Sequence, residues 1–244
     1  MADTILVPFE LPDPEPLPSV LVDDLASLEV VLLGHYAVPE QTPREAASDQ
    51  FEADAQETLD GIAARFEEAG GTVRTRLVFG KDRAGAIDQV MIDEECAAEL
   101  TPAPTEGVER ILVPVPDVAE FDRLPRFVQV LCEDSTTEIT LFHVVEAGED
   151  YEEGDLIVHE TRDGMVEAGL DPDLVDTRVA EGEDHDSNIL RVAAEYDAVV
   201  MYEATARLGD RIFGSLPDRI AKNTGDPVIV VRRDYEPEVR GEGA

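Results

Sequence analysis

The amino-acid sequence predicts an α/β protein made of two tandem doubly wound units, each with a parallel sheet covered by helices. Short apolar runs alternate with helical patterns along the chain, and residues 5–8 (ILVP) recur as residues 111–114. Strands joined through helices need right-handed crossovers, which lay the helices against the faces of a parallel sheet. The predicted units span residues 1–106 and 107–235, and residues 236–244 are expected to form a mobile polar tail.

The first unit is expected to begin with a buried strand and to alternate strands with helices from there. Thr42, Pro43 and Glu45 form a capping box with proline in the first turn, so a long helix begins there, and Gly70 ends it. Arginines alternate with apolar residues over residues 73–79, which is typical of a half-buried edge strand. The strands are expected at residues 5–9, 30–33, 73–79 and 97–101, and the shorter helices at residues 17–28 and 84–92.

The second unit repeats this order and then continues beyond it. Residues 75–80 of the first unit match residues 177–182, and Ile87 matches Ile189 at the same offset. After residue 101 the first unit runs within a few residues into the second, so it lacks the last helix and strand. The second unit's strands are expected at residues 110–115, 138–144, 175–179, 198–201 and 227–231, with a loop at 203–215 and a helix at 216–223.

The charge of the chain is strongly negative and is spread over every segment. There are 56 acidic residues against 19 basic ones, a net charge of −37, and only two of the basic residues are lysines, Lys81 and Lys222. The acidic side chains repel one another, and a high salt concentration screens this repulsion. The charge therefore favours a halophilic cytoplasm. No basic stripe could release counterions from nucleic acid or bind an anionic membrane surface, so neither partner is expected.

The sequence also predicts a cytoplasmic protein without a structural metal or disulfide. The N-terminus is acidic and leads at once into a strand, unlike a signal peptide, and the apolar stretch at residues 30–39 is too short to span a bilayer. Cys96 and Cys132 lie in different units, and the four histidines lack metal-ligand spacing. Asp82, Asp184 and Asp186 follow strands and are interpreted as helix caps.

Five segments of the second unit resemble the universal stress protein family, in its tandem, haloarchaeal form. The resemblance is weaker over the first unit. It implies a five-stranded parallel sheet in the order 3-2-1-4-5 for the second unit, and a homodimer paired through the last strand, Val228 to Val231. It also implies ATP as a cofactor in many members. The segments are residues 111–115 (ILVPV), 141–145 (LFHVV), 196–201 (YDAVVM), 213–219 (FGSLPDR) and 227–232 (PVIVVR).

The ATP-binding members carry the pattern G-x2-G-x9-G-[S/T] after the fourth strand and an Asp at the end of the first strand. The glycines let backbone N–H groups approach phosphates, and the last pair opens a helix whose N-terminus attracts anions. Here Gly214 is followed by Ser215, but Met201 and Ala204 replace the first two glycines. Pro116 stands in the Asp position.

The resemblance therefore yields one weakened candidate site, on the second unit. In one interpretation Gly214, Ser215 and two nearby arginines hold a phosphate, with Val144 in the adenine pocket; in the other, Gly214 and Ser215 are only a turn and a cap. The two lost glycines and Pro116 favour the second interpretation, because together they lower nucleotide affinity by about a hundredfold or more. On this interpretation the chain binds no cofactor. The candidate binding residues are Gly214, Ser215, Asp117, Val144, Ala204, Arg207 and Arg211.

Three functions remain open from the sequence. The first is a non-catalytic stress-response binding or regulatory protein, because no catalytic motif stands out. The second is an ATP-binding member of the family, which could also hydrolyse ATP slowly. The loop at residues 201–215 also resembles stress-protein domains associated with amino-acid transporters, so a regulatory module with a protein partner is a further alternative. The third is an unrelated doubly wound protein. Arg232 and Arg233 at the end of the last strand disfavour a receiver, and residues 116–119 (PDVA) lack the Ser/Thr-rich phosphate loop of a flavodoxin-like protein.

Overall fold

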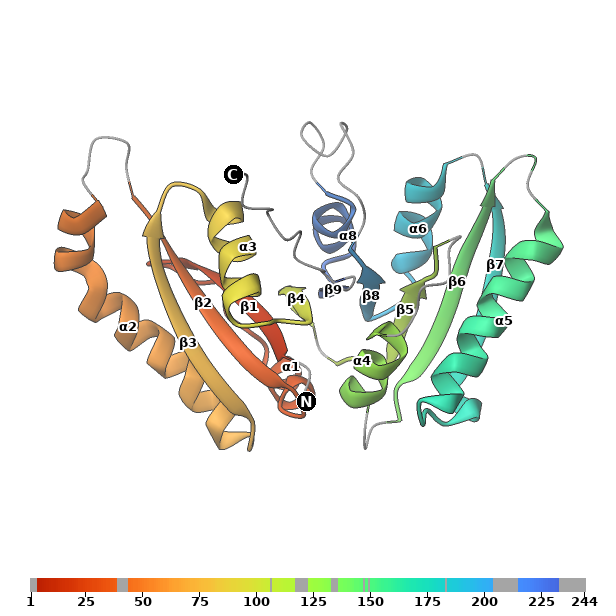
Figure 1. Ribbon diagram of the computed structural model, residues 1–244, viewed down its shortest axis with the longest axis horizontal. Helices are drawn as coiled ribbons and strands as arrows, with labels where there is room; N and C mark the ends of the chain where they lie inside the picture. The colour runs from red at the N-terminus through yellow and green to blue at the C-terminus, as the bar shows by residue number, and fades with distance from the viewer. Residues whose placement is uncertain are drawn as a thin grey trace, which may run out of the picture.

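One nine-stranded sheet runs through the molecule, in the order β3-β2-β1-β4-β9-β8-β5-β6-β7 (Figure 1). The computed structural model describes residues 4–38, 44–105, 107–116, 123–132, 136–146, 148, 150–182, 184–203 and 215–232. The second half of the chain contributes its strands in the spatial order 3-2-1-4-5, which confirms the expected order. The first half contributes 3-2-1-4, and β9 of the second half occupies the place next to its fourth strand.

The first half follows the expected alternation, with longer strands than the apolar runs alone suggest. Strand β2 extends well past the run at residues 30–33, because its register with β1 and β3 continues to Tyr36. Thr42 and Pro43 of the expected capping box lie outside the described residues. The elements are β1 (Thr4–Leu11), α1 (Ser19–Leu25), β2 (Glu29–Ala37), α2 (Arg44–Glu68), β3 (Thr72–Gly80), α3 (Arg83–Asp93) and β4 (Ala98–Thr101).

The second half repeats the series and adds a helix and a strand. The expected edge position of residues 73–79 is confirmed, since β3 closes one end of the sheet and β7 closes the other. The elements are β5 (Arg110–Pro114), α4 (Arg123–Leu131), β6 (Glu138–Glu146), α5 (Tyr151–Glu167), the short 3₁₀ helix η1 (Pro172–Leu174), β7 (Val175–Gly182), α6 (His185–Ala193), β8 (Ala198–Tyr202), α8 (Leu216–Thr224) and β9 (Val228–Val231).

Strand β9 pairs inside the chain rather than with a second copy. It lies parallel to β8 on one side and antiparallel to β4 on the other, with Leu100 opposite Ile229. Every other strand pair of the described sheet is parallel. The expectation that Val228–Val231 forms the homodimer contact is therefore wrong: both hydrogen-bonding edges of β9 are occupied, because the shortened first half leaves β4 free to pair with it. The homodimer itself is not tested by the pairing within one chain and stays a prediction.

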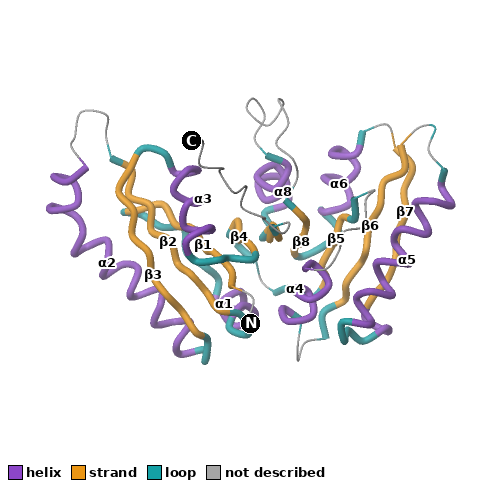
Figure 2. Tube along the Cα trace, in the orientation of Figure 1, coloured by secondary structure: helices purple, strands orange, loops and turns teal. Residues whose placement is uncertain are grey.

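The two faces of the sheet are packed differently. On one face α1, α2, α4 and α5 cover a single hydrophobic core that spans both halves, from Leu59 and Phe66 to Phe127 and Val158. On the other face lie α3, α6 and α8, and here the cores are separate (Figure 2). One lies beneath α6 and α8 and the other beneath α3. The continuous core joins the halves, whereas the divided face leaves room between them.

Candidate functional site

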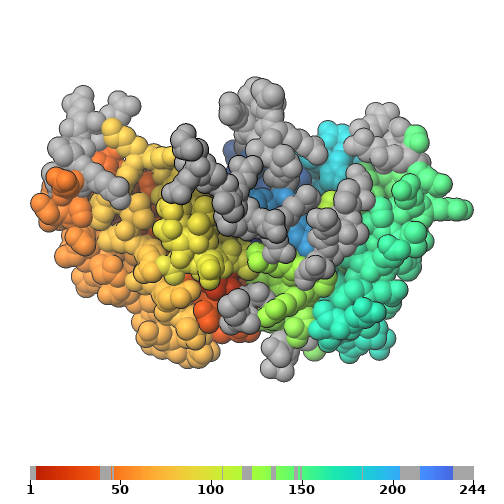
Figure 3. All heavy atoms as spheres, viewed as in Figure 1, coloured from red at the N-terminus to blue at the C-terminus, as the bar shows by residue number. Residues whose placement is uncertain are grey.

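A cavity of about 570 Å³ lies on the divided face of the sheet, where the two halves meet. Its second-half walls are the ends of β5 and β8, the first turn of α6 and the start of α8. Its first-half walls are α3 and β4. Figure 3 shows the two halves meeting along the middle of the molecule. The volume is in the range of small-molecule sites, which are commonly about 300–1,000 Å³.

The missing helix of the first half accounts for this cavity. In the second half, α8 packs on the sheet through Leu216 and Ile220 and shares a core with α6. The described part of the first half has no counterpart of α8 between β4 and β5, so the face of β4 beside α3 is not covered in the same way. The carboxyl ends of parallel strands are where doubly wound sheets place their ligands. The cavity combines that position with a wall from the first half.

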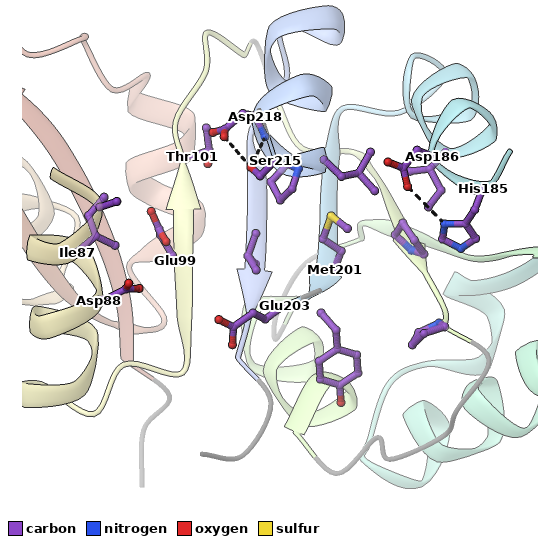
Figure 4. A pocket seen from close by; sticks show the side chains of 18 of the residues that line it. Ile87, Asp88, Glu99, Thr101, His185, Asp186, Met201, Glu203, Ser215 and Asp218 are labelled. Atoms are coloured by element: carbon purple, nitrogen blue, oxygen red, sulfur yellow. Dashed lines mark hydrogen bonds and ion pairs between the residues drawn. The ribbon is translucent and has the colours of Figure 1, made fainter. Parts of the chain in front are cut away.

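Ser215 is the one predicted phosphate-loop residue within the described part of the chain, and it lies at the cavity. It is the N-cap of α8: its Oγ accepts from the Asp218 amide N–H at 3.4 Å and donates to the Asp218 carboxylate at 2.6 Å. Ser215 and Asp218 both line the cavity (Figure 4). The predicted cap is confirmed, and its hydroxyl proton is directed to a carboxylate rather than to an anion site.

The remaining predicted site residues are not brought together by the described structure. Val144 is 1% exposed and packs in the core with Ile189, so it does not line the cavity as the adenine pocket would require. Met201 and Pro116, which replace residues of the family pattern, do line it. Gly214, Asp117, Ala204, Arg207 and Arg211 lie outside the described residues.

Two of the three aspartates expected to cap helices do so. Asp82 accepts from the Gly85 amide at the start of α3, and Asp184 accepts from the Ser187 amide at the start of α6. Asp186 lies in the first turn of α6 and forms an ion pair with Arg219 of α8 at 2.9 Å. That pair joins the two second-half helices at the rim of the cavity.

The charged side chains that line the cavity are predominantly acidic. Arg83 is the only arginine or lysine among the lining residues of the described chain. Arg232, just beyond β9, lies 3.5 Å from Asp88 and 3.9 Å from Glu203 and so bridges α3 to the end of β8. The carboxylates on the lining are Asp88, Glu99, Asp186, Glu203 and Asp218.

Glu99 is a partly buried carboxylate of the cavity and was not among the residues expected from the sequence. It lies in the middle of β4, opposite Val230 of β9. Burial, together with the negative charges of Asp88 and Asp218, raises the pKa of Glu99 to about 7, while Arg83 and Arg232 oppose the rise. The available signal was a single glutamate between Ala98 and Leu100, both of which are buried in the continuous core. A charged residue in a short apolar strand indicates a polar cavity on one face.

The described residues contain no group of three or more His, Cys, Asp or Glu side chains that could hold a metal ion. Cys96 and Cys132 are both buried and are not joined in a disulfide. None of the described helices is long and apolar enough to cross a membrane.

Comparisons with known proteins identify relatives of the second half and of the whole fold. Residues 107–232, slightly more than half of the chain, match the model of the Universal stress protein family. A universal stress protein from Archaeoglobus fulgidus DSM 4304 is similar with a TM-score of 0.68 and 15% identity, covering 96% of this chain and 98% of that chain. No curated protein matches the sequence.

Two further solved structures are similar. A functionally unknown protein from Pseudomonas aeruginosa PAO1 has a TM-score of 0.52 and 15% identity, covering 96% of this chain and 93% of that chain. A universal stress protein in complex with cAMP has a TM-score of 0.41 and 16% identity, covering 51% of this chain and 96% of that chain. At these identities the likeness concerns the fold alone.

Proposed function

The chain belongs to the universal stress protein family, and from this premise we propose that it is a non-catalytic stress-response protein that binds a small molecule in the junction cavity. The observation that carries the proposal is the cavity itself, at the carboxyl ends of β5 and β8 and beside the start of α8. Ion pairs and a helix cap engage Asp186, Glu203 and Asp218 around it. Because these three carboxylates are engaged by ion pairs and a helix cap, we expect them to position a ligand rather than to transfer its protons.

An adenine nucleotide is the second candidate ligand, and Ser215 favours it. Ser215 begins a helix whose N-terminus faces the cavity, and unpaired amides at such an end attract anions. Asp218 in the first turn of the same helix opposes this attraction with its own charge. The acidic lining therefore supports a ligand without a polyphosphate, such as a nucleoside, over ATP.

Three finer features belong to the same proposal. The shared strand order of the halves supports a tandem arrangement with a shortened first copy. The net charge of −37 supports a cytoplasm of high salt concentration. Regulation of a protein partner, of the kind found with transporter-associated stress-protein domains, would use the ligand as its signal.

Calorimetric titration with adenosine and with ATP, in multimolar KCl, tests the proposal. We expect saturable adenosine binding and no release of inorganic phosphate from ATP. Ala84→Trp on α3, where Ala84 is exposed and lines the cavity, should abolish binding by filling the opening. Ala64→Trp on α2 is the matched control, because Ala64 is exposed and does not line the cavity. Absence of adenosine binding at millimolar concentration, or equal binding to both variants, would contradict the proposal.

A further inference from the structure

The first half of the chain contributes one wall of a cavity that otherwise belongs to the second half. Along β4 the side chains of Ala98 and Leu100 enter the continuous core, so Glu99 and Thr101 point to the opposite face and line the cavity. The antiparallel register sets Glu99 opposite Val230, which also lines it. Figure 4 shows Glu99 and Asp88 on the first-half side, across from Ser215 and Glu203. The charge of this wall is therefore set by the first half.

The positive charges near the wall neutralise it only in part. Arg232 approaches Asp88 at 3.5 Å and Glu203 at 3.9 Å, so two carboxylates share its guanidinium. Glu99 forms no ion pair within the described part of the chain, and Arg83, at the start of α3, is exposed. An anion that enters beside α8 therefore faces a surplus of negative charge, because Arg83 and Arg232 offset the lining carboxylates only in part.

We propose that Glu99 makes the first half a charge-selective wall, which admits a neutral or cationic ligand to the cavity and excludes an anionic one. This rests on the proposed ligand-binding function and names the residue that determines its specificity. In a cavity partly shielded from solvent, like charges repel more strongly than at an open surface, and salt screens them less. The wall would thus separate a nucleoside from its nucleotides although both carry the same base and sugar.

Selectivity should depend on pH, because the pKa of Glu99 is raised to about 7. Below that pKa the carboxyl is neutral and the wall loses a charge; above it the carboxylate is ionised and repels anions. The groups that face Glu99 are Arg83 and Asp88 of α3, Asp218 of α8, and Arg232 after β9. Glu203 and His185 of the second half line the same cavity, and Arg232 links Glu203 to Asp88.

The test compares adenosine, which is neutral, with cAMP, whose phosphodiester keeps one negative charge across the relevant pH range. Calorimetric titrations at about pH 5.5 and at about pH 8.5 lie on either side of the Glu99 pKa. We expect wild-type affinity for cAMP to fall roughly tenfold from the lower to the higher pH, while adenosine affinity stays constant. Glu99→Gln should bind cAMP roughly tenfold more tightly than wild type at the higher pH and lose the pH dependence.

Glu67→Gln, an exposed site on α2, is the control with the same change in net charge, and should behave as wild type. If adenosine binds but Glu99→Gln leaves cAMP affinity and its pH dependence unchanged, the charge-selective wall is overturned and the ligand-binding function stands. If neither compound binds wild type or Glu99→Gln, the proposed function fails and the wall with it.

Discussion

At the scale of single residues, His35 shows how the two halves differ at equivalent positions. The registers of β1 with β2 and of β5 with β6 set His35 of the first half in the place of Val144 of the second. His35 is 2% exposed, and neither of its ring nitrogens has a hydrogen-bond partner among the described residues. Burial, and then the charge of Arg83, lower the pKa of His35. The side chain is therefore held neutral at an energetic cost.

We predict that His35→Leu stabilises the protein, most clearly in mild acid. A buried polar group without a partner costs about 1–3 kcal/mol, and an apolar side chain of similar size removes that cost. Because the folded-state pKa lies below the unfolded value of about 6.5, the unfolded chain binds a proton that the folded chain does not. Stability is thus fully present above that value and is lost as the pH falls through it.

Denaturant unfolding of wild type and His35→Leu at about pH 7.5 and about pH 5 measures this difference. We expect a gain of about 1 kcal/mol at the higher pH and a larger one at the lower. The exposed His159 of α5 provides the control, His159→Gln, which should not alter the acid sensitivity of folding in the same way. A loss of stability in His35→Leu at both pH values would show that His35 has a partner in solution.

At the scale of elements, the caps decide where the helix beside the cavity begins and ends. Helix α8 begins after the Ser215 N-cap and ends at Gly225, whose φ of 78° lies in the left-handed region that glycine adopts without strain. Both signals were evident in the sequence, and the element is confirmed at residues 216–224 against the expected 216–223. Local capping chemistry is therefore sufficient to place this wall of the cavity.

We predict that Ser215→Ala lowers the free energy of unfolding by about 1 kcal/mol, because the Asp218 amide loses its acceptor. Ser215→Asn should retain most of the stability, since asparagine caps helices about as well as serine. Thermal or denaturant unfolding measures both variants. Equal stability of Ser215→Ala and wild type would show that the cap contributes nothing and that Ser215 is free to contact a ligand.

At the scale of the whole molecule, the pairing of β4 with β9 joins the halves and creates the cavity. The alternating pattern, the edge strand and the order 3-2-1-4-5 followed from local periodicity and from resemblance to a known family. The β4–β9 contact could not follow from either, because Leu100 and Ile229 are far apart in sequence and carry no signal for each other beyond being apolar. Glu99 was missed for the same reason, since its surroundings exist only once that contact has formed.

The expected adenine-pocket role of Val144 failed for a related reason. Its position near the end of β6 was foreseen, but the side chain lies in the core that the sheet shares with α6 and α8. Whether a strand-end residue lines a cavity or enters the core depends on which helix lies above it, and a single sequence does not contain that information. The cavity begins instead at Pro116, just past the neighbouring strand β5, and at Met201 of β8, two strands from β6.

A disulfide cross-link between β4 and β9 tests the joined sheet most directly. Leu100 and Ile229 lie directly opposite each other, and Cβ atoms of such pairs are about 4.5–5.5 Å apart, close to the distance that a disulfide spans. We would measure the mass and the linked peptides of Leu100→Cys/Ile229→Cys after oxidation, with Cys96 and Cys132 replaced by alanine. We expect a cross-link within one chain and no covalent dimer from Ile229→Cys alone. A covalent dimer of Ile229→Cys, with no link within the double variant, would show that β9 pairs between chains and that the two halves do not share a cavity.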